Sequence, residues 1–306
     1  MRAVVCTRWG PPEVLRVQEL PTPVPRGNEV RVRIRATAVT SSDCYTRGLA
    51  LSPAFQLMAR LALGWNAPRQ PVLGMVLSGE VDAVGPDATS LVVGQPVFGF
   101  NHRRFGTYAQ DVCWPEDGFL VTRPANLTDE EAAAIPYGGL LALCRLREAG
   151  VGAGQRVLVY GASGAVGTSA VQLARDLGAD VTGVCSGANG DLVTSLGAAS
   201  VVDYTREDFT NASTRYDLIL DAVGKRKSSA ALRRGQRVLA AGGAIVSVDD
   251  GRPDIRREDL VLLAELVTRG ELRPVIDRTY PLDEIVEAHR YVDGGHKRGN
   301  VIITVP

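Results

Sequence analysis

A glycine-rich turn is the feature of this sequence that most directly predicts chemistry. It reads Gly161-Ala162-Ser163-Gly164-Ala165-Val166-Gly167, after the apolar run Arg156–Tyr160 and before a helical pattern over 166–177. Gly164 lets the backbone approach a pyrophosphate, and Gly167 lets the helix pack closely on the strand, with free N–H groups facing the phosphates. We predict a dinucleotide site at residues 162–167, with a glycine turn that binds no ligand as the alternative.

The end of the following strand indicates which dinucleotide binds. NAD sites place an acidic residue there, about 20 residues after the turn, to bind the ribose hydroxyls. The run Asp180–Val184 instead ends in Cys185-Ser186, without a carboxylate. This leaves room for a 2′-phosphate beside the hydroxyl of Ser186 and the amide of Asn189. Tyr204 and Arg206, after the third strand, could complete the pocket. We therefore predict NADPH as the cofactor.

The bulk properties argue against several other classes of protein. The 306 residues carry 34 basic and 34 acidic side chains, so no net charge favours nucleic acid or an anionic membrane. The N-terminus lacks the apolar core of a signal peptide, and no apolar run is long enough to span a membrane. The five cysteines are scattered and form no Cys-x-x-Cys pair. We expect reduced thiols in a cytoplasmic protein whose partner is a small molecule.

The pattern of apolar and polar residues changes after Pro124. Before it, short β-rich runs alternate with turn residues, and 30–36 shows the two-residue period of a half-exposed strand. One apolar helix or loop is expected from Pro53 to about Leu63. After it, Thr128 begins a helix, and apolar runs then alternate with helical ones, as in βαβ units. The five expected strands are 156–160, 180–184, 200–204, 216–221 and 243–248.

This pattern predicts an α/β protein with a Rossmann doubly wound parallel sheet and a smaller, mostly β domain. The last part of the chain adds expected helices at 257–269 and 282–292 and a strand at 300–305. The predicted domains are 1–123 for substrate, 124–270 for the dinucleotide, and 271–306 returning to the first.

Several short segments together resemble the medium-chain dehydrogenase/reductases of the quinone oxidoreductase group, the zinc-free relatives of alcohol dehydrogenase. Beyond the glycine turn, these segments cover nearly the whole chain in the family's order: Gly10–Leu15, Val39–Asp43, Leu73–Met75 with Gly79–Val81, Asp221–Gly224 and Gly295–Val301. The resemblance implies a GroES-like substrate domain and an active site in the cleft between domains. It also implies cofactor contacts from Ala222, Val223, Gly224, Ser247 and Arg298.

The resemblance also bears on metal. Zinc-dependent relatives hold catalytic zinc with side chains at the positions of Thr40, Met75 and Tyr137, none of which is a plausible zinc ligand. The four clustered cysteines of the structural zinc site are missing as well. We therefore expect no metal. Without a Lewis acid, reduction of a quinone or conjugated double bond is more natural than alcohol oxidation.

Some positions depart from the family. Relatives usually carry glutamate at Val76, threonine near Leu141, aspartate at Gln95 and, often, lysine at Asn300. Many also insert a loop and a sixth sheet strand after Val248, where they dimerise. Because this chain runs almost directly into a helix there, we expect five strands. We also expect either a monomer or a dimer that does not use that edge.

The catalytic assignment depends on the segment after Thr40. Tyr45 stands where several reductases of the superfamily place a tyrosine facing the substrate, and its phenol could donate a hydrogen bond to an enolate. An interior tyrosine bonded to a carbonyl is an equal alternative. Ser42 matches the hydroxyl that relays protons in zinc relatives. Asp43 is expected to bond loop backbone, and Cys44 to be a small buried residue.

Three further expectations are open. His102 is expected on a surface loop rather than in catalysis, and the stretch from Phe55 to Trp65 either caps an apolar substrate or packs as an ordinary helix. The predicted function is NADPH-dependent hydride transfer to a quinone or α,β-unsaturated carbonyl. The alternatives are a zinc-free alcohol or aldehyde dehydrogenase and a non-catalytic NADPH-binding protein.

Overall fold

The chain divides into two compact units in the computed structural model, which describes residues 1–49, 53–101, 105–211 and 213–306. The first unit contains residues 1–136 and 276–306, and the second contains residues 137–275. The predicted domain boundaries near 123 and 270 stay predictions.

The second unit is built on a five-stranded sheet in which each adjacent pair is parallel. The strands lie in the order β10-β9-β8-β11-β12, so the first strand in sequence has the second and fourth as neighbours. This order is that of a Rossmann fold, and it reverses direction between β8 and β11. Its strands are β8 Arg156–Tyr160, β9 Asp180–Cys185, β10 Ser200–Asp203, β11 Tyr216–Asp221 and β12 Leu239–Ser247.

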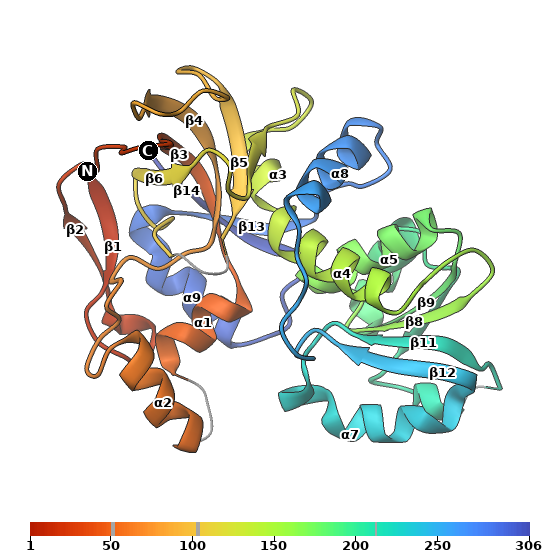
Figure 1. Cartoon of the computed structure of the whole chain (residues 1–306). Helices are drawn as coiled ribbons and strands as arrows, with labels where there is room; N and C mark the ends of the chain where they lie inside the picture. Colours follow the sequence, from red (N-terminus) through yellow and green to blue (C-terminus); the bar gives the residue numbers. More distant parts are fainter. Residues whose placement is uncertain (50–52, 102–104, 212) are drawn as a thin grey trace. The chain divides into compact units, whose positions relative to one another are not determined.

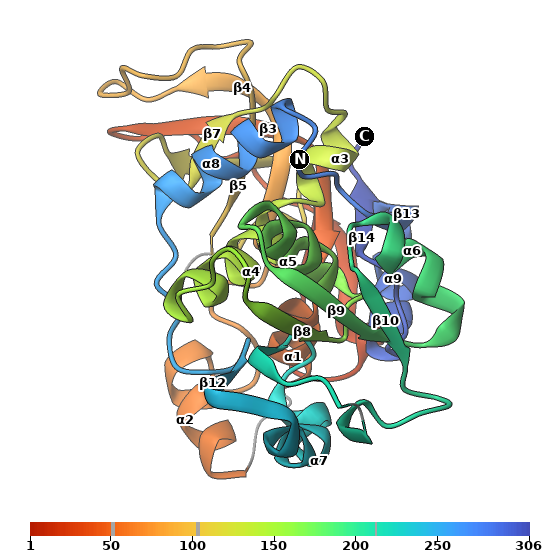
Figure 2. The same ribbon diagram turned by 90° about the vertical axis from the view of Figure 1, so that its right-hand side faces the viewer.

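Helices cover both faces of this sheet, as a doubly wound fold requires. Figure 1 shows α4 and α5 on one face and α7 on the other, and in Figure 2 α6 lies beside β10. The α-helices of this unit are α4 Pro136–Glu148, α5 Ala165–Asp176, α6 Gly190–Ser195, α7 Lys225–Gly235 and α8 Arg257–Thr268. Ten of the twelve residues of α5 are buried, which explains why this helix needs small residues where it meets the sheet.

The first unit is mostly β. A seven-stranded sheet runs in the order β13-β14-β3-β4-β5-β7, and β6 also pairs with β3. A separate hairpin pairs β1 with β2 in antiparallel register. The strands are β1 Arg2–Cys6, β2 Leu15–Glu19, β3 Glu29–Val39, β4 Val76–Val84, β5 Pro96–Phe100, β6 Asp111–Pro115, β7 Leu120–Thr122, β13 Ile276–Pro281 and β14 Asn300–Thr304.

Strand β3 organises this unit because its side chains alternate. Val30, Val32 and Ile34 are fully buried, whereas Arg31 and Arg33 point to the other face, where both bind Asp82. The end of β3 pairs with β14, so the last residues of the chain complete a sheet begun by the first forty. Residues 301–304 thereby pair with residues 36–39 in antiparallel register.

Short helices lie around the sheet of the first unit. They are α1 Ser41–Gly48, α2 Pro53–Leu63, α3 Asp129–Ala133 and α9 Ile285–Asp293, and a single 3₁₀ turn, Leu282–Glu284, precedes the last. Figure 1 shows α1 beside α9, although more than 200 residues separate them in sequence. Thr128 caps α3 through a reciprocal bond with Glu131, as its sequence predicts.

The predicted fold class and the five parallel strands are confirmed. The expected helix at 282–292 begins with a 3₁₀ turn, since Pro281 precedes it and the α-helix starts only at Ile285. Several elements were not predicted, among them α7 and β13. Strand β12 lies at one edge of its sheet. The expected monomer, or dimer that does not use this edge, stays a prediction.

Candidate functional site

The glycine turn lies where the Rossmann strand order reverses. It follows β8, and its first two backbone N–H groups, those of Gly161 and Ala162, donate to the carbonyl of Val184 on β9, each at 3.0 Å. Gly161 has φ of +83°, a conformation that favours glycine, and a side chain there would collide with Val223. The turns after β8 and β11 therefore meet at the carboxyl ends of the strands, the usual ligand position in such sheets.

The other two glycines of the turn differ in what surrounds them. A side chain at Gly167 would overlap the carbonyl oxygen of Gly161 and lie 2.7 Å from the Cα of Ala162. At Gly164 only one neighbour, the Gly161 oxygen, lies within 4 Å, at 3.6 Å. Gly167 is thus needed for packing, whereas the space above Gly164 is open. This open space fits a phosphate group.

The helix that follows has an N-terminus suited to an anion. Gly164 is the N-cap of α5, and no side chain caps this end. The first N–H groups of a helix have no partner within it, and the helix dipole makes this end positive. With Gly164 open above them, the N–H groups of Ala165 and Val166 are available to phosphate oxygens. The residues present therefore fit a dinucleotide pyrophosphate.

Three predicted cofactor residues are joined by one side chain. The amide nitrogen of Asn189 donates to the hydroxyls of Ser163, at 3.2 Å, and Ser186, at 3.1 Å. Asn189 belongs to a 3₁₀ turn that directly follows β9, and its amide links that turn to the glycine turn. The structure therefore brings together the two hydroxyls that sequence reasoning placed near the pyrophosphate and the 2′-position.

A carboxylate that the sequence analysis did not consider lies beside this group. Asp203 ends β10, and a side chain at Gly187, next to Ser186, would collide with its carboxylate. Hydrogen bonds from the Thr205 hydroxyl and backbone, and from the backbone of Gly187, lower the pKa of Asp203 below its ordinary value. Arg206 lies 3.5 Å from it. The sequence offered one signal: Asp203 lies near the end of the expected strand 200–204, and in a Rossmann sheet this strand lies beside the one that ends at Cys185.

The turn after β11 is held by a buried carboxylate. Asp221 is fully buried and accepts bonds from the backbone of Val223 and Gly224 and from the hydroxyls of Ser228 and Ser247, the last two at 2.7 Å. Sequence reasoning had assigned Ser247 to the cofactor. Its side chain is fully buried and also accepts from the Asp249 backbone.

Gly224 completes this turn. It has φ of +99° and is the N-cap of α7. Val223 is about one-third exposed and stands opposite Gly161. The segment Ala222–Gly224, predicted to contact the cofactor, therefore borders the glycine turn. Asp221 holds the backbone of this segment through hydrogen bonds, and Ser247 holds Asp221.

In the first unit, helix α1 carries both predicted catalytic residues. Ser42 and Tyr45 are half-buried on its first turns, and each interacts with other groups of the protein. Thr40 caps the helix: its hydroxyl and backbone N–H donate to Asp43, at 2.7 and 2.9 Å, and the backbone N–H of Asp43 donates back at 3.2 Å. As expected, Asp43 binds loop backbone.

The cap places a carboxyl group inside the unit. Asp43 is fully buried, and desolvation raises its pKa to about 6, although bonds from Thr40, Tyr108 and Gly74 oppose this shift. Burial and the nearby Asp43 raise the pKa of Tyr108 well above its ordinary value. Both groups therefore stand in an apolar environment beneath the helix.

A buried arginine on α1 forms the centre of a polar cluster with α9. The guanidinium of Arg47 donates to the Gly10 carbonyl at 3.1 Å, to Nδ1 of His289 at 2.8 Å and to Asp293 at 2.5 Å. His289 is fully buried, and its ring lies at 89° to that of Tyr108, 5.6 Å between centroids. We call these four residues, Gly10, Arg47, His289 and Asp293, the Arg47 cluster.

The cluster explains the chemistry of Cys44. Its Sγ lies 3.4 Å from Nδ1 of His289, although no histidine is near it in sequence. Burial raises the pKa of Cys44, and burial with the charge of Arg47 lowers the pKa of His289 to about 3. A neutral imidazole whose Nδ1 accepts from Arg47 does not activate a buried thiol. Cys44 is a small buried residue, as its sequence predicted.

The remaining predicted residues are more scattered. Tyr204 follows Asp203 and is about half exposed, while Arg298 belongs to the first unit, where its backbone N–H donates to Asp277. Leu141 lies half-buried on α4. His102 and the side chain of Phe55 lie outside the described residues.

Helix α2 leaves several of its apolar side chains exposed. Its side chains Leu57, Met58 and Leu61, with Trp65 just after it, are 52 to 67% exposed. The two alternatives for this stretch, a cap over an apolar substrate and an ordinary packing helix, therefore both stay predictions.

The described residues contain neither a candidate metal cluster nor a membrane-spanning helix. No group of three or more His, Cys, Asp or Glu side chains within them is placed to hold a metal ion. The helices of the described segments are too short or too polar to span a lipid bilayer.

Comparison with known families matches both units. Residues 26–125 match the alcohol dehydrogenase GroES-like domain, and residues 165–273 and 247–303 match two families described as zinc-binding dehydrogenase. The chain is 30% identical to the mitochondrial NAD(P)H oxidoreductase RTN4IP1 of Mus musculus over 354 residues, which covers 100% of this chain and 89% of that protein.

Two further relatives have informative names. The chloroplastic NADPH-dependent alkenal/one oxidoreductase of Arabidopsis thaliana is 25% identical over 321 residues, covering 99% of this chain and 79% of its own. The structure of the quinone oxidoreductase from Coxiella burnetii superposes with a TM-score of 0.85 at 27% identity, covering 100% of this chain and 99% of the other.

Proposed function

Because the chain belongs to the medium-chain dehydrogenase/reductase superfamily and is an NAD(P)H-dependent oxidoreductase of its quinone and enone reductase branch, we propose that it uses NADPH to reduce a quinone or an α,β-unsaturated carbonyl compound. The observation that carries this proposal is the open space above Gly164 at the uncapped N-terminus of α5.

The cofactor would be held by the second unit. Backbone N–H groups of Ala165 and Val166 would bind the pyrophosphate, with the hydroxyl of Ser163 beside them. The hydroxyl of Ser186, which accepts from Asn189, would bind the adenosine end. Bound NADPH supplies the hydride. In favour of the 2′-phosphate are the neutral end of β9 and the NADPH dependence in the name of the Arabidopsis relative. Asp203, close to Ser186, is the feature that limits this preference.

The first unit would supply the polar groups for the acceptor. We assign Tyr45 as the hydrogen-bond donor to the carbonyl oxygen on which negative charge develops when the β-carbon accepts hydride. A phenol suits this role because it is neutral before and after. We assign Ser42 to relaying the proton that the α-carbon then takes up.

We also propose that the reaction needs no metal. The hydroxyl of Thr40, at one of the family's zinc-ligand positions, is engaged with Asp43 in the helix cap. The other two positions, Met75 and Tyr137, carry a thioether and a phenol, which zinc sites rarely use.

Steady-state NADPH oxidation tests the proposal. The acceptors are 1-octen-3-one, a benzoquinone and, in the reverse direction with NADP⁺, primary alcohols. We expect turnover with the enone or the quinone, and a loss of about 100-fold in kcat for Tyr45→Phe. Tyr216→Phe, at the opposite end of β11 from the cofactor turn, is the matched control. Alcohol oxidation alone, or NADPH binding without turnover of any acceptor, would reject the proposal.

A further inference from the structure

A groove in the first unit is lined mainly by apolar side chains. Its volume is about 530 Å³, within the range of small-ligand sites. The indole N–H of Trp9 donates to the Gly64 carbonyl at 3.0 Å, so the ring offers only apolar surface to a ligand. The other apolar lining residues include Leu63, Val72, Phe105, Ala109 and Val112. Neither Ser42 nor Tyr45 is among the described residues that line the groove, so it is a separate candidate site.

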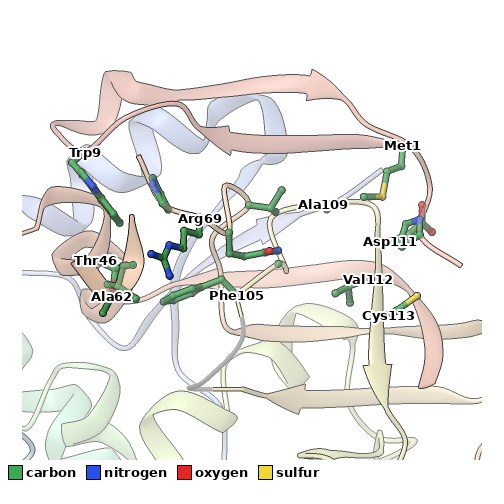
Figure 3. A pocket seen from close by; sticks show the side chains of 16 residues that line it. Met1, Trp9, Thr46, Ala62, Arg69, Phe105, Ala109, Asp111, Val112 and Cys113 are labelled. Carbon is green, nitrogen blue, oxygen red and sulfur yellow. The ribbon is translucent and has the colours of Figure 1, made fainter. Parts of the chain in front are cut away.

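One end of the groove carries a cation. Figure 3 shows Arg69 at this end, near Thr46, Ala62 and Phe105. The guanidinium donates to the Leu61 carbonyl at 3.1 Å, which anchors it beside α2, and a guanidinium has five N–H donors in all. The sequence has no aspartate or glutamate over residues 44–79. The segment that carries Arg69 therefore supplies no carboxylate of its own, and the exposed guanidinium can receive an anion.

The opposite end of the groove carries charges of both signs. Figure 3 shows Met1 and Asp111 there. The Met1 ammonium donates to the Leu20 carbonyl at 2.7 Å and lies 3.5 Å from the Glu19 carboxylate. Burial raises the pKa of Asp111, and the Met1 ammonium opposes this shift. This end therefore favours neither an anion nor a cation, whereas the Arg69 end attracts anions.

From this distribution of charge we propose that the groove binds an aliphatic carboxylate, with its head at Arg69 and its tail directed toward Val112. The planar guanidinium presents its N–H groups in a geometry that matches a carboxylate. The tail would cover the apolar side chains of Val72 and Phe105 and end before Asp111. The site does not depend on the proposed reduction, since it uses no group assigned to the cofactor or to the acceptor.

The affinity of such a ligand should come mostly from its tail. Each buried methylene is expected to tighten binding by up to about fourfold. Isothermal titration calorimetry of the full chain without cofactor, with hexanoate, octanoate and decanoate below their micellar concentrations, measures this dependence. The dissociation constant should fall along the series. A constant that stays level or rises with chain length, or no binding of decanoate, would overturn the proposal.

Three octyl ligands test the head group. In buffer of low ionic strength octanoate should bind about three- to fivefold more tightly than 1-octanol, because an ion pair at an exposed guanidinium adds only a modest amount. Octyltrimethylammonium should bind more weakly than 1-octanol. The advantage of octanoate should disappear at about 0.5 M NaCl, since salt screens the pair. Equal affinity of the three ligands, or tightest binding of the cation, would contradict the proposed orientation.

A pair of charge variants locates the head. Arg69→Gln should lower the affinity for octanoate to that for 1-octanol and should leave binding of 1-octanol unchanged. This second measurement separates loss of the charge from damage to the groove. Arg35→Gln removes an exposed cation outside the groove and should change neither affinity. If the two variants bind octanoate equally well, Arg69 does not hold the head.

A pair of bulky variants locates the tail. Ala62→Phe adds bulk at an exposed position of α2 that lines the groove, so octanoate and 1-octanol should both bind at least about tenfold more weakly. Val92→Phe adds similar bulk at a 64% exposed site outside the groove and should weaken neither. Equal affinities in these two variants would place the tail elsewhere.

Thermal unfolding shows whether the native protein is what binds. A ligand of the native state raises the melting temperature, whereas a ligand of the unfolded chain lowers it. Decanoate at about ten times its dissociation constant should therefore raise the melting temperature of the wild type, with little effect on Ala62→Phe. A lowered melting temperature of the wild type would overturn the proposal.

Discussion

The two units organise their polar residues in opposite ways. In the second unit the glycine turn, Asn189 and Asp221 act over short stretches of chain, and most of their partners lie within about 30 residues of them in sequence. In the first unit, Arg47 of α1 meets His289 and Asp293, more than 240 residues away. A local arrangement leaves a motif in the sequence, whereas a long-range one leaves only isolated charged residues.

The two units should also differ in how they respond to substitutions. The cofactor side depends on the absence of side chains, since at Gly167 any Cβ would meet backbone. The acceptor side depends on the presence of a buried cation, Arg47, each of whose three guanidinium nitrogens donates a hydrogen bond. The first should fail by steric overlap and the second by an uncompensated buried charge or an unsatisfied polar group.

The largest effect is expected at Gly167. Gly167→Val would force β8 and α5 apart, and the free energy of unfolding should fall by about 4 kcal/mol, with cofactor binding lost. Urea unfolding and NADPH titration measure the two effects. Gly152→Ala, where no atom lies within 4 Å of the added carbon, is the control. A Gly167→Val protein as stable as this control would show that the turn is not packed as described.

The next effect concerns the Arg47 cluster. Arg47→Met removes the cation and leaves Asp293, Nδ1 of His289 and the Gly10 carbonyl without their donor. The free energy of unfolding should fall by about 3 kcal/mol. Arg33→Met, at an exposed ion pair, should change it by less than about 1 kcal/mol. Equal effects of the two substitutions would mean that the buried cluster does not stabilise the unit.

Two buried groups of the first unit should make stability respond to pH in opposite directions. The folded-state pKa of Asp43 is raised to about 6, so its contribution is present below its ordinary value and is lost as pH rises through about 6. The pKa of His289 is lowered to about 3, so its contribution is present above its ordinary value and is lost as pH falls toward 3. Between pH 6 and 4 the two largely cancel.

His289→Asn should expose the contribution of Asp43. Relative to the wild type, the variant's free energy of unfolding should increase by about 2 kcal/mol as pH falls from 6 to 4. Urea unfolding at several pH values measures this difference, and asparagine keeps an acceptor for Arg47. If the difference between the two proteins is the same at pH 6 and pH 4, His289 does not have the lowered pKa.

The smallest effect is a change in cofactor preference. Asp203→Asn removes a negative charge beside Ser186 and Gly187, and it should raise the ratio of NADPH to NADH in kcat/KM by about fivefold. Asp208→Asn is the control, because the Asp208 carboxylate also accepts bonds from a threonine two residues later, Thr210, but lies outside the predicted pocket. An unchanged ratio would show that the charge of Asp203 does not act on the 2′-position of the bound cofactor.

The sequence predicted the elements whose patterns are local. The five strands, the helix after the glycine turn and the cap at Thr128 are all present, because apolar runs and capping residues act over a few positions. Two of the elements that were not predicted illustrate a weaker pattern. Helix α7, Lys225–Gly235, buries only Ser228, Ala231, Leu232 and Gly235, so its apolar stripe is weak. Strand β13 is a half-exposed edge strand that ends at Pro281.

The candidate site was also predictable only where it depends on local sequence. The glycine turn and the group around Asn189 follow from local sequence, whereas Asp203 reaches Gly187 only because β9 and β10 are neighbours. The Arg47 cluster could not be predicted, since nothing near Cys44 or Arg47 in sequence indicates His289. Tyr45 and Ser42 stay predictions about catalysis.

Titration of the protein with NADPH, for the wild type and for Gly164→Ala, tests the central claim most directly. An alanine fits the backbone at Gly164, so thermal stability should not change, but its methyl group would enter the space assigned to the pyrophosphate. The account predicts binding by the wild type and affinity at least about tenfold weaker in the variant. No binding by the wild type, or equal affinity in both, would contradict it.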